Sequence, residues 1–352
     1  MYYPEILFDC ERMRRPFTGK YAFCRELALR LADESKKHSC SFGLYLPEVA
    51  EPFCPELPHV GFKRFHKWVM PHDRNLKVFH STTPLSRYYP KDRRVSIITT
   101  VHDLNYLHYE VSKKEFEWHD RRTLNAIRRS DRIVTISEDA KRDILAHYGD
   151  PGKPIDVIYN GLNTFSGDIQ APERIPEGKF LFSVCRITRS KNLHTLPALL
   201  EGNDYKLFIA GKDIKDGHLG QIFEEARRWG TADRLIYTGP VSEGVKHWYL
   251  QNCEAFLFPS LAEGFGLPVL EALQYGKPVF CSDRTSLPEI GGDLVFYFNH
   301  GFEPRAMQDE FRRGMDDFRR NPPGEERIKA HLAGFSWEKA AKEYFELYLK
   351  SL

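Results

Sequence analysis

Two glutamates eight positions apart, Glu263 and Glu271, enclose a glycine-rich stretch that ends in Pro268. Proline suits the first turn of a helix, so we expect Glu263 in a loop and Glu271 one turn inside the helix that follows. A carboxylate can accept two neighbouring hydroxyls of a sugar or ribose, each charged hydrogen bond contributing roughly 1.5–3 kcal/mol. Bare N–H groups at the helix start favour anionic or hydroxyl-rich ligands. The alternative is a helix whose early acidic residues only stabilise its dipole.

Arg186 and Lys191 form a second group, in a loop expected between an apolar strand and a helix. A nucleoside diphosphate gains negative charge as it departs from a sugar, and fixed cations stabilise that charge most in the transition state. The arginine fork matches phosphate oxygens and lysine adds a compact charge. The alternative is a solvated basic loop.

His102 and Asp103 follow the apolar strand expected over residues 96–101. Polar side chains at the end of a buried strand suit ligand contact, because ligands of parallel sheets bind beyond the carboxyl ends of the strands. The alternative is a histidine whose neighbouring aspartate is its structural partner.

A close match to a known family signature surrounds the two glutamates. It consists of Pro259–Leu273, Gly276–Val279 and Leu287–Ile290. This pattern resembles the retaining GT-B glycosyltransferases of group 1, which carry an E-x7-E motif. His102 and Asp103 with their neighbours, together with residues 286–289, resemble a mannosyltransferase-like branch of that family.

The resemblance implies a role for each residue of the second half. Glu263 would contact the donor sugar, Glu271 the ribose hydroxyls, and Arg186 with Lys191 the diphosphate. Backbone groups would supply the rest of the donor pocket: Gly264, Phe265, Gly266 and Leu267 for sugar and phosphate, and Val241 for the base. The sequence departs from the family at Cys185, where glycine is frequent, so the geometry of the loop that carries Arg186 and Lys191 is expected to differ slightly.

In the first half the resemblance implies that His102 positions the sugar and is not a general base. A front-face mechanism is commonly inferred for retaining members, with the leaving phosphate helping to deprotonate the acceptor. Asp103 is expected to orient His102 or to contact the acceptor. The segment 15–21 matches a family loop near the diphosphate and acceptor only weakly, because it has one glycine. That glycine, Gly19, is expected to contact the donor, and Lys20 to contact the acceptor or position the sugar.

No metal or other cofactor is expected. The sequence has no D-x-D, the pattern by which many other glycosyltransferases hold a divalent cation. Arg186, Lys191 and the helix start after Gly266 would carry the diphosphate charge instead.

The elements that must position these residues alternate as strand and helix through both halves. This predicts an α/β protein of the GT-B type, with two Rossmann-like doubly wound domains and a cleft between them. The expected strands are 6–8, 41–46, 77–80, 96–101, 132–136 and 155–158, then 179–184, 206–210, 235–238, 255–258 and 278–281.

The break in this rhythm sets the expected domains. Residues 164–178 lack periodicity and contain two glycines and two prolines, which indicates a linker. We expect an acceptor domain over 1–163, a nucleotide-sugar domain over 164–335, and a closing helix over 336–352 that returns to the first domain, with Ser336 as its N-cap.

Charge is nearly balanced at +2, but the first 160 residues carry +5 and the remainder −3. Residues 60–94 hold nine basic residues and two acidic ones. That segment is either a solvated face or a surface for an anionic membrane or a phosphate-bearing acceptor. The acidic N-terminus and the absence of a long apolar run predict a cytoplasmic protein, with membrane contact at most peripheral.

The prediction is therefore a retaining, metal-independent hexosyltransferase of cell-surface polysaccharide synthesis. Its donor would be GDP-mannose or a UDP-hexose, and its acceptor a glycan or lipid-linked saccharide. A second enzymatic hypothesis is phosphorolysis or nucleotide-sugar epimerisation on the same fold. A third is a non-catalytic GT-B protein that binds nucleic acid or another polyanion through residues 60–94, although no nucleic acid partner is expected.

Overall fold

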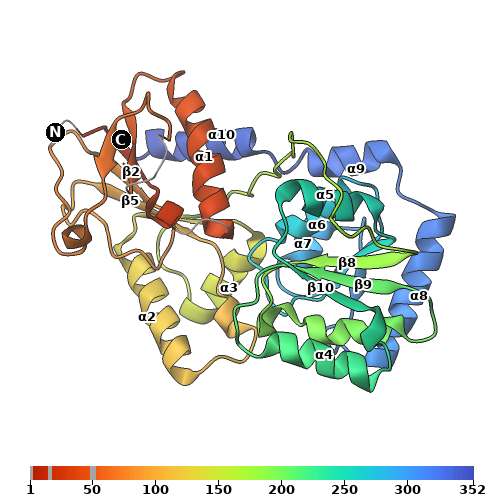
Figure 1. Cartoon of the computed structure of the whole chain (residues 1–352). Helices are drawn as coiled ribbons and strands as arrows, with labels where there is room; N and C mark the ends of the chain where they lie inside the picture. Colours follow the sequence, from red (N-terminus) through yellow and green to blue (C-terminus); the bar gives the residue numbers. More distant parts are fainter. Residues whose placement is uncertain (1–2, 15–17, 48–52) are drawn as a thin grey trace. The chain divides into compact units, whose positions relative to one another are not determined.

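Alternating strands and helices build two parallel β-sheets (Figure 1). The structure is a computed structural model that describes residues 3–14, 18–47 and 53–352. Unit 1 comprises Met1–Gly161 with Phe335–Leu352, and unit 2 comprises Leu162–Gly334. The chain thus passes from unit 1 to unit 2 two residues before the expected boundary at 163, and it returns at Phe335.

The sheet of unit 1 has seven parallel strands in the order β3-β2-β1-β4-β5-β6-β7. Their bounds are β1 Ile6–Asp9, β2 Phe42–Leu46, β3 His59–Gly61, β4 Val78–Ser81, β5 Ser96–Val101, β6 Arg132–Thr135 and β7 Ile155–Val157. Because all strands are parallel, the residues that follow β1, β4 and β5 share one edge of the sheet.

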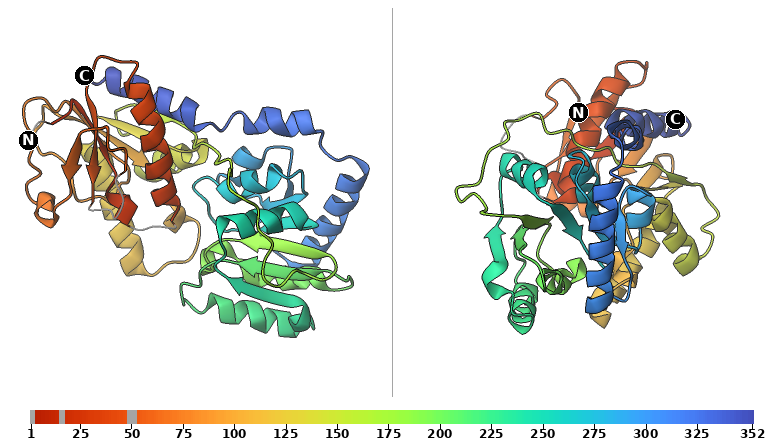
Figure 2. Two further views of the ribbon diagram at one scale, coloured as in Figure 1. Left: turned by 45° about the horizontal axis from the view of Figure 1, so that its top comes forward. Right: turned by 90° about the vertical axis from the view of Figure 1, so that its right-hand side faces the viewer.

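Helices cover both faces of this sheet. They are α1 Gly19–Ser35, α2 Lys113–Arg129, α3 Glu138–Tyr148 and α10 Trp337–Leu349, with short 3₁₀ turns η1 Glu11–Arg14, η2 Arg64–Lys67 and η3 Asn105–Leu107. The closing helix α10 lies beside α1 in Figures 1 and 2 and packs against it. Ser336 caps α10 by accepting a hydrogen bond from the Lys339 amide at 3.2 Å, as expected from the sequence.

A buried polar chain fixes α10 to the sheet. His80 is fully buried; its Nδ1 lies 2.6 Å from the Tyr348 hydroxyl and its Nε2 2.8 Å from Thr100 Oγ1. Thr100 continues the chain to the Tyr344 hydroxyl at 2.9 Å. Burial, together with the neighbouring His102, lowers the pKa of His80 to about 3, so its imidazole is neutral.

The sheet of unit 2 has six parallel strands in the order β10-β9-β8-β11-β12-β13. Their bounds are β8 Phe180–Val184, β9 Lys206–Ala210, β10 Leu235–Gly239, β11 Ala255–Phe258, β12 Val279–Ser282 and β13 Phe296–Phe298. Its helices are α4 His218–Arg228, α5 Glu243–Asn252, α6 Leu267–Leu273, α7 Leu287–Gly291, α8 Pro304–Arg320 and α9 Glu325–Leu332, with 3₁₀ segments η4 Arg189–Lys191, η5 Leu193–Leu200 and η6 Ala232–Arg234. Figure 1 shows α4 on one side of the strands β8–β10 and α5 and α6 on the other.

The predicted strands are all present, with no end more than one residue from its expected position, and the α/β architecture is confirmed. Two short edge strands, β3 and β13, were not predicted. The expected linker, residues 164–178, forms neither helix nor strand, but it packs along unit 2: Phe165 stacks on His247 at 4.5 Å between ring centres, and the Gln170 amide donates to the Gly244 carbonyl. No helix in the described part of the chain has the length and apolar character needed to cross a bilayer.

Candidate functional site

Loops that follow the strands of unit 2 meet at one edge of its parallel sheet and carry the predicted donor-binding residues. Arg186 and Lys191 follow β8, Val241 follows β10, and Glu263 follows β11. The spacing of the two glutamates predicted their settings correctly, since Glu263 lies in a loop and Glu271 in the second turn of α6.

Glu263 and Lys191, which the sequence assigned to different parts of the donor, contact each other. Lys191 Nζ lies 2.5 Å from Glu263 Oε1, and the Ser260 hydroxyl donates to the same oxygen at 2.6 Å. The two charged side chains are 16% and 13% exposed. The pair therefore places a fixed carboxylate beside a fixed ammonium. The carboxylate can accept further hydrogen bonds, and the ammonium can donate further ones.

The glycine-rich loop is held from the side by the residues after β12. Thr285 Oγ1 accepts a hydrogen bond from the Glu263 amide at 2.9 Å, and the Ser286 hydroxyl bonds the carbonyls of Glu263 and Phe265 at 2.9 and 3.0 Å. Gly266 ends the loop with φ of 107°, and a Cβ there would lie 2.6 Å from Leu287 Cδ2. A glycine is needed at this position both for its backbone angle and for space.

Glu271 is held by a lysine that the sequence analysis missed. Lys246 of α5 lies 3.1 and 3.0 Å from the two carboxylate oxygens of Glu271 and 2.8 Å from Glu243. The side chains of Lys246 and Glu271 are 11% and 12% exposed, whereas Glu243 is 67% exposed. Burial raises the pKa of Glu271, and the Lys246 ammonium opposes that shift. The pKa of Lys246 is raised, because Glu271 and Glu243 outweigh its burial.

The two cations of the loop after β8 have different surroundings. Lys191 ends η4 and turns toward Glu263, while Arg186 is exposed. At the start of this loop the Cys185 amide donates to the Ala210 carbonyl at 3.1 Å. Gly211, with φ of 137°, passes so close to the Cys185 carbonyl that a Cβ would overlap it. Close packing at Cys185 is therefore accommodated by the glycine that follows the neighbouring strand β9.

Val241, the predicted contact to the base, lines a hollow of about 600 Å³ on unit 2. The hollow lies between β9, β10 and α5 and is closed on one side by residues 172–177 of the expected linker. Phe208, Ile236 and Tyr249 give it an apolar wall. Neither Glu263 nor Glu271 lines it, so it adjoins the candidate donor site only at the Val241 end.

His102 stands at the corresponding edge of unit 1 and is 6% exposed. Its Nε2 donates to the Thr82 carbonyl at 2.8 Å, which leaves Nδ1 as the acceptor nitrogen. The Phe23 ring packs edge-on against the imidazole with 4.7 Å between centres. Burial and the nearby Lys20 ammonium lower the pKa of His102 to about 4. The imidazole is therefore neutral at physiological pH.

Asp103 does not orient this imidazole through any hydrogen bond of the described residues. Its Oδ1 instead accepts from the Asn105 amide at 3.2 Å, so the Thr82 carbonyl performs the orienting role expected of Asp103. Gly19 and Lys20 form the first turn of α1. Residues 15–17, the beginning of the loop predicted to approach the ligand, lie outside the described residues.

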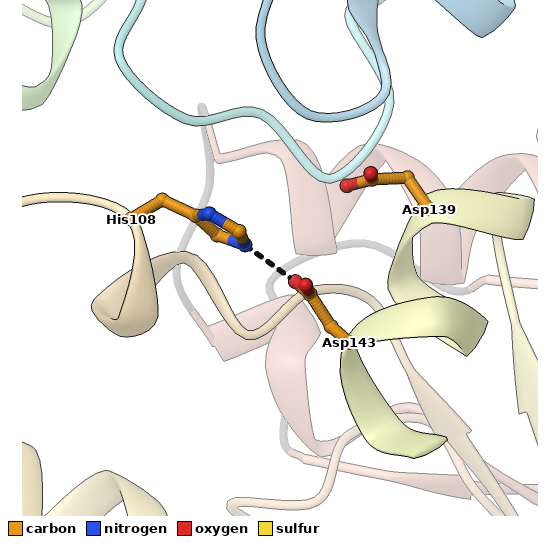
Figure 3. Close-up of side chains that lie close together, drawn as sticks. All are labelled: His108, Asp139 and Asp143. Atoms are coloured by element: carbon orange, nitrogen blue, oxygen red, sulfur yellow. Dashed lines mark hydrogen bonds and ion pairs between the residues drawn. The ribbon is translucent and has the colours of Figure 1, made fainter. Parts of the chain in front are cut away.

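The same edge of unit 1 holds one group of side chains able to ligate a metal ion among the residues that the structure describes. Figure 3 shows His108, from the loop after η3, facing Asp143 of α3, with Asp139 one turn earlier in that helix. His108 Nε2 lies 2.6 Å from Asp143, and Arg142 lies 3.0 Å from Asp139. Burial, followed by the Asp143 charge, raises the pKa of Asp139. Both carboxylates thus have protein partners, and the His108 contact ties the loop that follows His102 to α3.

Four residues of the unit 2 site lacked a usable sequence signal. Ser260, Thr285 and Ser286 lie inside or beside the matched segments, but a serine or threonine there reads only as a loop residue. Lys246 lies in a helix, where lysine usually faces water. Its burial follows from α5 packing against α6, a contact that no local pattern encodes.

Comparisons with known proteins agree with this fold. The family model described as glycosyl transferases group 1 matches residues 166–331, and the model described as glycosyltransferase family 4 matches residues 26–164. The two matches together follow the division into units. The chain belongs to the group 1 glycosyltransferases of the GT-B fold.

Individual relatives are mannosyltransferases by name. The serotype-specific mannosyltransferase WbdA of Escherichia coli is 30% identical over 60% of this chain, and the match spans 28% of WbdA. The O-antigen chain mannosyltransferase B of Escherichia coli is 24% identical, with 98% of this chain and 99% of the relative covered. The chain therefore spans less than a third of WbdA and almost all of mannosyltransferase B.

Among solved structures, the sucrose-phosphate synthase of Thermosynechococcus elongatus superimposes with a TM-score of 0.73 at 15% identity, covering 99% of both chains. This likeness confirms the fold.

Proposed function

We propose that the protein is a hexosyltransferase that uses a nucleotide-diphosphate sugar as donor. The observation that carries the proposal is the pair of anchored carboxylates in unit 2, Glu263 on Lys191 and Glu271 on Lys246. A carboxylate held in place by a cation keeps lone pairs for vicinal hydroxyls. Glu263 then binds hydroxyls of the sugar, and Glu271 binds those of the ribose.

The leaving group is stabilised by cations of the loop after β8. When the bond between the sugar and the diphosphate breaks, negative charge grows on the phosphate oxygens, and Lys191 and the exposed Arg186 supply positive charge there. Amides from Gly264 to Leu267 complete the pocket. No divalent cation is required in this scheme. The backbone around Val241 receives the base.

The transfer proceeds with retention of anomeric configuration. An acceptor hydroxyl bonds to the anomeric carbon on the face that the diphosphate leaves, and its proton passes to a departing phosphate oxygen. His102, neutral and fixed by Thr82, helps to position the sugar and does not act as a base. Asp103 and Lys20 remain candidates for contact with the acceptor.

The names of the relatives suggest which donor and acceptor to test. Because these relatives are mannosyltransferases by name, we propose GDP-mannose as the first donor to test, followed by UDP-hexoses, and a glycan or lipid-linked saccharide as acceptor. The reaction would take place in the cytoplasm and contribute to cell-surface polysaccharide. Residues 60–94 would hold the enzyme at an anionic membrane.

A donor screen tests the proposal. The protein is titrated with UDP, GDP and ADP and then with their sugars, in EDTA, with thermal stability as the readout. We expect stabilisation by one nucleotide family. Glu271→Gln should weaken that binding about 10- to 100-fold, because it removes charged hydrogen bonds worth roughly 1.5–3 kcal/mol.

Glu243→Gln is the matched control, since Glu243 contacts the same lysine but is exposed; its affinity should stay within about twofold of the parent. Equal binding by the Glu271→Gln variant would contradict the assigned role of that carboxylate. Failure of every nucleotide to bind, combined with salt-dependent binding of nucleic acid, would favour a non-catalytic polyanion-binding protein.

A further inference from the structure

A short apolar turn stands out on the surface of unit 1. Phe65, Trp68 and Val69 are 51%, 62% and 68% exposed. Exposed large hydrophobic side chains elsewhere in the described residues are scattered along the chain, whereas these three fall within five positions. We call residues 65–69 the apolar turn. In Figures 1 and 2 this orange segment lies on the outside of unit 1, away from α10.

Buried neighbours hold the apolar turn in place with its large side chains outward. His66 is 4% exposed, and its Nδ1 lies 3.0 Å from the Tyr45 hydroxyl. Met70, 3% exposed, packs in the core with Val60. The Trp68 amide donates to the Phe65 carbonyl at 2.9 Å, closing the turn. Exposure of the three apolar side chains is thus a feature of a structured turn with two buried anchors.

Cations surround the apolar turn. Lys63 and Arg64 are exposed beside it, and Lys67 Nζ lies 4.0 Å from the centre of the Trp68 ring. No acidic residue occurs between Leu57 and His72.

A second basic segment is joined to this surface. His72 Nε2 lies 3.2 Å from Asp92, next to the exposed Arg93 and Arg94. Met70 and Val95 belong to one core cluster, so both segments cover the same face of the sheet. The cations of residues 63–67 therefore flank the apolar turn, and those of residues 91–94 lie on the same side of the sheet.

We propose that the apolar turn inserts into the headgroup region of an anionic lipid bilayer. Trp and Phe prefer the boundary between headgroups and acyl chains, and Lys and Arg are attracted to anionic headgroups. The inference rests on the proposed function, because a membrane would present a lipid-linked acceptor to unit 1. It adds the residues that enter the bilayer and the kind of lipid that they require.

Other occupants fit this surface less well. In a symmetric dimer each copy would place Lys63, Arg64 and Lys67 against the same cations of its partner. A glycan would stack on the face of Trp68, where the Lys67 ammonium already sits. A nucleic acid would use the cations but would leave Phe65 and Val69 without a role.

Vesicle co-sedimentation tests the proposal on the full chain. The protein is mixed with vesicles of phosphatidylcholine alone or containing phosphatidylglycerol. We expect binding to the phosphatidylglycerol vesicles only, and at least tenfold weaker binding by the double variant Phe65→Ser/Trp68→Ser. The matched control is Trp118→Ser: Trp118 of α2 is 39% exposed and has Arg122 over its ring at 4.6 Å, but no apolar neighbours of this kind.

Binding of the Trp118→Ser variant should stay within twofold of the parent. The proposal is overturned if the parent does not bind the anionic vesicles, or if the double variant binds them as tightly as the parent. Sedimentation velocity without vesicles tests the dimer: a concentration-dependent dimer that the double variant abolishes would assign the turn to self-association instead.

Donor hydrolysis in solution separates this inference from the proposed function. The double variant should hydrolyse the donor at the parental rate when no vesicles are present, because the apolar turn supplies none of the proposed donor-binding residues. Vesicle binding without donor hydrolysis by any variant would contradict the proposed function but support the membrane-binding surface. Hydrolysis without vesicle binding would do the reverse.

Discussion

Replacement of either partner in the buried pair of Lys246 and Glu271 should lower stability, but by unequal amounts. Replacement of Lys246 by Met leaves the Glu271 carboxylate in a site that is 12% exposed, without its cation. Removing one partner of a buried pair costs about 3–5 kcal/mol. Glu271 can limit that loss by taking up a proton, which costs about 3 kcal/mol at pH 7 relative to its ordinary pKa. We therefore expect Lys246→Met to destabilise unit 2 by about 3 kcal/mol.

The opposite replacement leaves a milder defect. In Glu271→Gln, Lys246 keeps Glu243 at 2.8 Å, and the amide oxygen still accepts one hydrogen bond. A loss of about 1–2 kcal/mol is expected, as for a weakened charged hydrogen bond. The difference between the two variants is thus about 1–2 kcal/mol, although both break the same contact.

Hydrogen exchange of the amides in α5 and α6 measures these losses within unit 2. The pH dependence provides a second readout. Burial already raises the folded-state pKa of Glu271, and loss of Lys246 raises it further, so the folded variant binds more protons than the unfolded chain and Lys246→Met should become less destabilised as pH falls from 7 to 5. Equal losses for the two variants at pH 7, or a Lys246→Met defect that does not shrink at pH 5, would refute this reasoning.

Three further predictions follow from single contacts. The depressed pKa of His80, about 3, means that the unfolded state binds more protons below pH 6.5. His80 alone should therefore cost unit 1 about 3 kcal/mol between pH 6.5 and 4, in addition to the loss from His102, whose pKa is about 4. His80→Gln should reduce the pH slope of thermal unfolding by the share of His80, and an unchanged slope would count against this reasoning. Gly266→Ala should lower the unfolding temperature and abolish nucleotide binding. Its control is Gly276→Ala, where φ is 60° and the space around the Cβ is open; this variant should lose about 1 kcal/mol of stability and still bind the nucleotide. Similar nucleotide titration curves for both variants would exclude a shape requirement at the loop. Lys191→Met should slow donor hydrolysis by about 100-fold or more. Arg189→Met, which removes an exposed side chain of the same 3₁₀ turn, should change the rate less than threefold. Equal hydrolysis rates for the two variants would show that Lys191 does not stabilise the leaving group.

Much of the fold could be predicted because each strand of a doubly wound sheet is a local apolar run. β11 is buried on both faces and its sequence is continuously apolar, and β5 carries three apolar residues among buried threonines, so both were placed to the residue. β3 is a three-residue edge strand with one buried side chain, and β13 is equally short. Such segments owe their conformation to pairing with a neighbour and carry no periodicity of their own.

The candidate site shows where local reasoning stops. The positions of Glu263 and Glu271 follow from a loop, a proline and a helix, all readable along the chain. The contact of Glu263 with Lys191, 72 residues away, depends on which strands become neighbours in the sheet. In the same way the orientation of His102 by the Thr82 carbonyl requires β4 and β5 to be adjacent.

Charge alone could not show whether residues 60–94 bind a partner or only face solvent. The sequence shows nine cations, which fit a solvated face, a membrane or a nucleic acid equally well. The structure adds that Phe65, Trp68 and Val69 point outward while His66 and Met70 point inward. This alternation within a 3₁₀ turn has no signature in a pattern of period two or 3.6.

The most direct test of the account is to follow the donor by NMR in the presence of EDTA. The wild-type protein is incubated with the nucleotide sugar that binds best, and the sugar released by slow hydrolysis is observed before it mutarotates. The account predicts release of the anomer with the donor's own configuration, without added metal, and loss of that release in Glu263→Gln. First appearance of the opposite anomer, or release only after a divalent cation is restored, would contradict a metal-independent retaining transfer at this site.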